Sequence, residues 1–362
     1  MSKRIYFDYA ASSPLDGEVL KAMLPYLKKE WGNPSSAHSF GQKARAALER
    51  AREKVAKFLS CQPLEVVFTS GATEANNLVI QGLLQSQNSP HVITSKIEHE
   101  SVLSPIQELE VKGVVEATYI APNKEGIIDP ADVQKAIKAN TILVSIMYAN
   151  SEIGTIQPIA EIGAMIQKLK IENRKSKIVF HTDAVQAAQF LDCDVQKLGV
   201  DLLTLSGHKI YGPKGVGVLY IKERTSLSPL HVGGGQEQGM RSGTENVAGI
   251  VGMGEAVEEV QNPKASVRNI KIRQLRDLLI KEVLKKIPGS LLSGSPTLRL
   301  PNNAHFRFQG IHGKDLAILL DQKGFAVSTG SACSEKTEEP SHVLLALGLS
   351  VEESLSALRV IS

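Results

Sequence analysis

Short apolar runs alternate with longer amphipathic stretches over most of the first 245 residues, and this alternation constrains the fold more than any other feature. Strands are expected at 65–69, 91–94, 141–147, 177–180, 201–205 and 216–221, and helices at 73–85, 101–111 and 159–169. Pro105 is tolerable in the second helix because it is expected in the first turn. The pattern predicts an α/β fold, with a mostly parallel sheet and helices on both faces.

The pattern changes after about residue 246. An amphipathic stretch covers 247–287 with an interruption near Pro263, and short strands are expected at 304–308 and 326–328. We therefore expect two domains. A large α/β domain spans residues 15–245, and a smaller α+β domain is formed by residues 1–14 and 246–362.

The charge and cysteine content exclude several classes of protein. The formal net charge of the 362 residues is +3 and the basic residues are scattered, which gives no support for a nucleic-acid or membrane-surface role. No apolar run approaches the length of about 20 residues needed to span a bilayer. The N-terminus enters a strand-like segment at once, leaving no room for a signal peptide. Three cysteines, an odd number, argue for a reducing compartment, and we expect the cytoplasm.

Lys209 is the residue most suggestive of chemistry. It follows the apolar segment 200–204 and lies in the glycine-containing run LSGHKIYGPKG at 205–215. A lysine at the end of a buried strand can lose its proton to desolvation and become a nucleophilic amine. Such an amine forms a Schiff base with a carbonyl group, above all that of pyridoxal 5'-phosphate (PLP). The alternative is an ordinary loop cation.

Two further segments at predicted strand ends could hold a phosphorylated ring. The small-residue turn at 69–77 opens a helix, so Ala72 and Thr73 could contribute to a phosphate cradle, or Thr73 could simply cap the helix. Asp183 follows the strand at 177–180 and could keep a pyridine nitrogen protonated, with Gln186 on the same face reaching the ring hydroxyl. Asp183 as a plain helix cap is the alternative.

Histidine and hydroxyl side chains complete the set. His99 follows the strand at 91–94 and could stack on a planar ring while moving protons, although a loop histidine can also be solvated and idle. Ser206 and His208, beside Lys209, add donors for a phosphate. Because ligands of parallel sheets gather at the carboxyl ends of the strands, we expect these groups to form one site.

Four motifs carry a family resemblance over nearly the full length. They are YFDYAA at 6–11, GNPSSAH at 32–38, SGHK at 206–209 and GMRSGT at 239–244. With these motifs the chain resembles the class V aminotransferases of PLP fold type I, specifically cysteine desulfurases of the NifS/IscS type. The resemblance implies that the mostly parallel sheet of the large domain is of the seven-stranded type. The resemblance implies that PLP is bound by Lys209, with the other site residues in the roles above and with no metal. It also implies a homodimer, because the threonine matching Thr244 reaches the phosphate of the other subunit.

The run STGSACS at 328–334 distinguishes members of this superfamily. Cys333 in such a small-residue loop can act as a thiolate that takes sulfur from a bound cysteine, whereas Cys61 and Cys193 lie in more apolar sequence and suit inert thiols. The segment resembles the desulfurase catalytic loop. The resemblance also implies that Arg359 and Asn33 contact the substrate, the arginine by gripping its carboxylate.

The chain departs from the family pattern at three places. Ser151 stands where an asparagine usually helps hold cofactor or substrate. Asn150 beside it could replace that asparagine, although neighbouring residues of a strand point to opposite sides. The run NNAHFRF at 302–308 differs from the usual Asn-x-Ser-Phe, and the chain stops soon after Arg359, where relatives continue into a segment that commonly takes part in scaffold docking.

The sequence therefore indicates a cysteine desulfurase that converts L-cysteine to L-alanine and passes sulfur, as a persulfide on Cys333, to an acceptor or iron–sulfur scaffold protein or toward tRNA thiolation. A selenocysteine lyase or another class V aminotransferase is one alternative, which amino-acceptor dependence would distinguish. A non-catalytic partner of a sulfur-transfer complex is the other, and it predicts no cysteine turnover.

Overall fold

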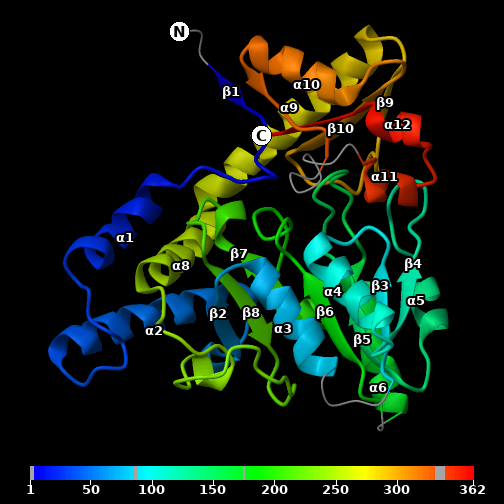
Figure 1. The fold of residues 1–362 in the computed structure, drawn as a ribbon. Helices are drawn as coiled ribbons and strands as arrows, with labels where there is room; N and C mark the ends of the chain where they lie inside the picture. The colour runs from blue at the N-terminus through cyan, green and yellow to red at the C-terminus, as the bar shows by residue number, and fades with distance from the viewer. Residues whose placement is uncertain (1–3, 85–88, 174–175, 331–338) are drawn as a thin grey trace.

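A single large sheet organises the first part of the chain (Figure 1). The computed structural model describes residues 4–84, 89–173, 176–330 and 339–362. The strands of the large sheet are β2 (Val66–Thr69), β3 (His91–Ser95), β4 (Glu116–Ile120), β5 (Thr141–Ser145), β6 (Val179–Asp183), β7 (Leu202–Ser206) and β8 (Gly217–Ile221). Their order is β2-β8-β7-β6-β5-β3-β4, and β8 alone among them runs opposite to the other six strands. The predicted mostly parallel, seven-stranded sheet is confirmed.

Helices cover both faces of this sheet. Neighbouring residues of each strand point to opposite sides, so apolar side chains are available for packing on both faces. The helices are α1 (Gly17–Lys28), α2 (Ser39–Leu59), α3 (Ala72–Leu84), α4 (Glu100–Val111), α5 (Pro130–Ala136), α6 (Ile159–Glu172), α7 (Val195–Leu198) and α8 (Val247–Gln261). In β5, Leu143 packs in one core with α3 and α4, while the next residue, Val144, packs in the other with α2, α6 and α8. Both faces of the strand are buried, as its continuous apolar pattern predicts.

The helix α4 departs from expectation at Pro105. The helix begins at Glu100, so this buried proline is its sixth residue and not part of the first turn, and that prediction was wrong. The ring therefore removes the hydrogen bond that a residue here would donate to the carbonyl of Ser101.

The remaining elements gather at one end of the large sheet (Figure 1). They are α9 (Pro263–Lys286), β9 (Ser290–Leu292), β10 (Asn303–Phe308), α10 (Gly313–Gln322), β11 (Phe325–Ala326), α11 (His342–Ala346), α12 (Val351–Leu355) and β12 (Ala357–Ile361). A three-stranded antiparallel sheet has β10 between β12 and β9, and β1 (Ile5–Tyr6) pairs in parallel with β11. Within the described residues, no helix combines the length and apolar character needed to cross a membrane.

The break predicted near Pro263 separates two helices. Asn262 ends α8 and caps α9 by accepting a hydrogen bond from the backbone N–H of Lys264, and Pro263 occupies the first position of α9. The side chains of Met253 and Val257 in α8 lie in the core of the large sheet. The predicted domain boundaries assign α8 to the smaller domain, whereas α8 packs on the large α/β unit. The boundaries themselves stay a prediction.

A glycine sets the close approach of α6 to the end of α7. A Cβ on Gly163 would lie 2.1 Å from the carbonyl oxygen of Leu198. We expect Gly163→Ala to lower the free energy of unfolding by about 1–3 kcal/mol, because backbone atoms must move apart. Gly17→Ala in α1 is the matched control, since its Cβ would meet no atom within 4 Å. Urea unfolding curves would measure both, and equal stabilities would contradict the packing described.

Candidate active site

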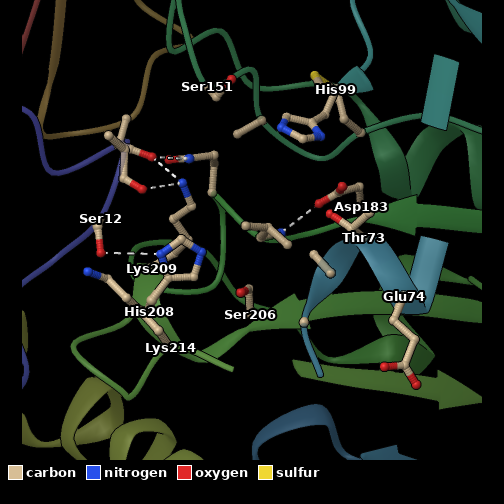
Figure 2. A pocket seen from close by; sticks show the side chains of 18 of the residues that line it. Ser12, Thr73, Glu74, His99, Ser151, Asp183, Ser206, His208, Lys209 and Lys214 are labelled. Atoms are coloured by element: carbon tan, nitrogen blue, oxygen red, sulfur yellow. Dashed lines mark hydrogen bonds between the residues drawn. The ribbon is translucent and has the colours of Figure 1, made fainter. Parts of the chain in front are cut away.

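The carboxyl ends of the parallel strands open into one cavity of about 480 Å³ (Figure 2). Loops after β2, β3, β5, β6 and β7 reach it, as the parallel arrangement requires. The lining contains many of the residues singled out in the sequence, namely Ala72, Thr73, His99, Asp183, Gln186, Ser206, His208, Lys209 and Arg359. The structure thus brings together groups from strands and helices far apart in the chain.

Lys209 projects into this cavity from the short 3₁₀ turn that follows β7. Its Nζ donates hydrogen bonds to the backbone carbonyls of Ala10 and Ala11, the latter at 2.9 Å. Gln186 Nε2 also donates to the Ala10 carbonyl, at 3.0 Å. The N-terminal segment therefore forms one wall of the cavity, which its motif alone did not predict.

Asp183 is the last residue of β6 and is buried. One carboxylate oxygen accepts a hydrogen bond from the backbone N–H of Val185 at 3.0 Å, and the other accepts from Asn76 Nδ2 at 2.8 Å. Turns, not a helix, follow Asp183, so it does not cap a helix. Two hydrogen bonds fix the orientation of this carboxylate and stabilise its charge inside the cavity.

The part of the cavity that lies low in Figure 2 is suited to binding an anion. Here Thr73 lies at the N-terminus of the 13-residue helix α3, where unpaired backbone N–H groups and the helix dipole favour negative charge. Ser206, His208 and Lys214 face the same space. Burial and the neighbouring charges of Lys209 and Lys214 lower the pKa of His208 to about 4, so this imidazole is neutral at physiological pH. The sequence argument missed Lys214, although it stands five residues after Lys209.

Arg359 contributes a buried guanidinium from β12, only 2% exposed. Nη2 pairs with Asp8 Oδ1 at 2.8 Å and Nη1 donates to the carbonyl oxygen of Ser151 at 3.2 Å. Nε is buried and has no partner among the described residues. Arg359 also lines the cavity, so its guanidinium is the group best placed to meet a carboxylate ligand.

Ser151 lines the cavity and Asn150 does not. The Asn150 amide is used by its own turn and by the loop after β3, since Oδ1 accepts from the N–H groups of Glu152 and Ile153 and Nδ2 donates to the carbonyl of Ile97. The side chain therefore points away from the ligand space, and the expected replacement of the family asparagine by Asn150 has no geometric support.

Three other sequence-derived candidates lie elsewhere. Asn33 accepts a hydrogen bond from the N–H of Ser35 at 2.9 Å in the exposed loop between α1 and α2. Thr244 is exposed and lines a smaller neighbouring cavity of about 100 Å³. Cys333 falls at 331–338, outside the described residues.

The site fits a phosphorylated pyridine aldehyde. A primary amine, a fixed carboxylate and a helix N-terminus converge on one cavity, and they match an aldehyde, a ring nitrogen and a phosphate. Comparison with known proteins agrees, because residues 5–360 match the family described as aminotransferase class-V. The chain belongs to this family. Its members depend on PLP.

Similar proteins extend over almost the whole chain. It is 47% identical to the cysteine desulfurase IscS of Dictyoglomus turgidum, covering 99% of this chain and 89% of that protein. It is 45% identical to the cysteine desulfurase IscS 1 of Archaeoglobus fulgidus, covering 96% and 89%. Among solved structures, a NifS-like protein superposes with a TM-score of 0.91 at 36% identity, covering 99% and 93%. SspA in complex with cysteine superposes with 0.86 at 38% identity, covering 98% of each chain.

A buried acid lies beside His99. The Glu98 side chain is enclosed behind the cavity, where Oε1 accepts from the Ser95 hydroxyl and, at 2.9 Å, from the N–H of Met147. Burial raises the pKa of this carboxyl to about 8, despite these hydrogen bonds and with help from the charge of Asp183. Glu98 is therefore mostly protonated in the folded protein at neutral pH.

This shift predicts a pH-dependent stability. The folded protein holds a proton that the unfolded chain releases between its ordinary pKa and about 8, so stability falls as pH rises through that window. Glu98→Gln removes the effect, and we expect its free energy of unfolding relative to the parent to increase by up to about 1.4 kcal/mol per pH unit there. Urea denaturation between pH 5 and pH 8 measures the difference. Glu100→Gln, at an exposed neighbour, is the control, and a pH-independent difference for Glu98→Gln would contradict the assignment.

Proposed function

We propose that this protein is a PLP-dependent cysteine desulfurase, which releases L-alanine from L-cysteine and takes up the sulfur. The observation that carries the proposal is the meeting of Lys209, Asp183 and His99 in one cavity of a class-V aminotransferase fold. The full-length similarity to proteins named cysteine desulfurase, and the likeness to SspA in complex with cysteine, support this substrate.

The chain has side chains or backbone groups suited to bind each part of the cofactor. Lys209 would bind the aldehyde carbon, Asp183 would pair with the ring nitrogen and Gln186 would reach the ring oxygen. The N-terminus of α3 with Thr73, together with the group Ser206, His208 and Lys214, would hold the phosphate. When bound, PLP supplies an electron-withdrawing ring that stabilises negative charge developing on the substrate.

Substrate cysteine is oriented by its carboxylate. The guanidinium of Arg359 would bind that carboxylate, because it lines the cavity while Asp8 and the Ser151 carbonyl hold it in place. Once free of its resting contacts to Ala10 and Ala11, the amine of Lys209 is the base that takes the substrate Cα proton.

Cys333 completes the reaction. Its thiolate attacks the substrate sulfur, the Cβ–S bond breaks, and a new S–S bond forms on the enzyme. Overall, one cysteine and one Cys333 thiol become one alanine and one Cys333 persulfide, so atoms and electrons balance without another reactant. The persulfide would pass to an acceptor or iron–sulfur scaffold protein, or toward tRNA thiolation.

The proposed active unit is a homodimer in the cytoplasm. Thr244 is exposed and lines a small cavity that shares Ser70 and Gly215 with the main site, and this exposure supports a contact with a second subunit. The odd number of cysteines suits a reducing compartment.

Replacing Cys333 tests the sulfur-accepting role. We expect Cys333→Ala to abolish alanine release from L-cysteine while PLP binding is retained, because the thiolate acts after the cofactor is loaded. Cys61→Ala is the matched control, since burial raises the pKa of that thiol to about 12 and makes it a poor nucleophile. Alanine is quantified with a reductant present. Undiminished turnover by Cys333→Ala, or turnover that requires an added amino acceptor, would count against a desulfurase.

Replacing Lys209 tests cofactor attachment. Borohydride reduction of the PLP-loaded protein should fix the cofactor to the peptide containing Lys209, as read by mass spectrometry. We expect Lys209→Ala to lose this label and at least about a hundredfold in kcat/KM. Lys214→Ala should keep the label while binding PLP more weakly. Labelling at another lysine would refute the assignment.

A further inference from the structure

Asn76 is a fully buried residue of α3 that the proposed mechanism does not use. Its Nδ2 donates one hydrogen bond to Asp183 Oδ2 at 2.8 Å and another to Ser101 Oγ at 2.9 Å. Its Oδ1 is buried without a partner among the described residues. A carboxylate only accepts hydrogen bonds, so the amide group must face Asp183 with its nitrogen. The side-chain carbonyl stays without a partner because this orientation presents both N–H donors to Asp183 and Ser101.

Ser101 extends this chain of donors to His99. The backbone N–H of Ser101 donates to His99 Nδ1 at 3.1 Å, and Ser101 Oγ lies 2.8 Å from the same nitrogen. Because a backbone N–H can only donate, Nδ1 must offer its lone pair, and the proton of the neutral ring is on Nε2. The Ser101 hydroxyl accepts from Asn76, which leaves its own proton to point at Nδ1.

We propose that Asn76 is a positioning residue that, through Ser101, holds His99 neutral with its proton on Nε2 and at the same time fixes Asp183. The catalytic meaning of this arrangement rests on the proposed function, whereas the protonation state of His99 does not. One amide thus orients both Asp183, which is expected to pair with the ring nitrogen, and His99, which is expected to stack on the ring.

The charges around His99 are consistent with a neutral ring. Burial lowers the pKa of His99, the Asp183 carboxylate raises it, Lys209 lowers it, and Glu100 and His342 make smaller opposing contributions. An imidazolium would carry a hydrogen on Nδ1 that faces the Ser101 N–H, so the hydrogen-bond geometry disfavours the charged ring as burial does.

A consequence follows for proton transfer. In this form His99 presents an N–H donor, not a lone pair, to the cavity, since Nδ1 is occupied by Ser101. His99 can therefore stack and donate a hydrogen bond in the resting protein, but it cannot take the first proton at Nε2. That role is left to Lys209.

The protonation state can be read directly by ¹⁵N NMR of histidine-labelled protein, with and without PLP. The His99 signals are assigned by their loss in His99→Gln. In the parent we expect Nδ1 to be unprotonated and Nε2 protonated at neutral pH, with a His99 pKa below the ordinary value. Asn76→Ala should raise that pKa by about one unit, because the Ser101 hydroxyl becomes free to rotate and accept from Nδ1.

Two further variants make the test specific. Ser101→Ala should raise the His99 pKa by a similar amount, and the double variant with Asn76→Ala should add little, because both act through one hydroxyl. Asn77→Ala is the matched control. This neighbour donates to the Thr73 carbonyl and accepts from Gln81, outside the chain of donors.

Activity provides a second readout. Because Lys209 and not His99 takes the first proton, the lower limb of the pH profile of kcat/KM for cysteine should stay in place in Asn76→Ala, Ser101→Ala and Asn77→Ala, even where the His99 pKa read by NMR moves. A protonated Nδ1 in the parent, or equal shifts in Asn76→Ala and Asn77→Ala, would overturn the proposal. If cysteine were not a substrate, the NMR results would still stand, so failure of the proposed function is separable. Should Asn76→Ala not fold, Ser101→Ala alone decides.

Discussion

Parallel pairing of β3, β5, β6 and β7 is the constraint on which the site depends. It directs the carboxyl end of each strand to the same edge, so one loop from each strand can reach a shared ligand. The strands are buried on both faces and are therefore rigid, so the side chains at their ends are held in fixed positions. Asp183 and Ser206 are terminal strand residues, and Lys209 follows one turn later.

Both ends of the chain close the cavity. The backbone of the N-terminal segment accepts hydrogen bonds from Lys209, and its Asp8 pairs with Arg359 of β12. Tyr9 and Ile361 are joined by a backbone hydrogen bond of 3.3 Å, so the two segments hold each other beside the sheet edge. The Lys209 amine and the Arg359 guanidinium are thereby both held by the N-terminal segment, the first through neutral carbonyls and the second through one carboxylate.

Burial decides which groups carry charge. It keeps Glu98 protonated and His208 neutral near pH 7, while hydrogen bonds from Asn76 and Val185 hold the Asp183 carboxylate. When burial shifts the pKa values of neighbouring groups in opposite directions, a single fold can separate acid, base and anchoring roles.

The alternation of apolar runs determined the sheet, and the polar residues directly after those runs determined most of the site, because strand ends are set locally. The strand β4 escaped detection because it is half-exposed, and β12 because it is short and has the charged Arg359 at its centre, so neither shows a continuous apolar run. Only the tertiary structure decided that Ser151 and not Asn150 faces the cavity, and that Asn76 joins Asp183 to His99. Sequence patterns report which face a residue occupies, whereas hydrogen bonds between elements depend on distances that packing alone sets.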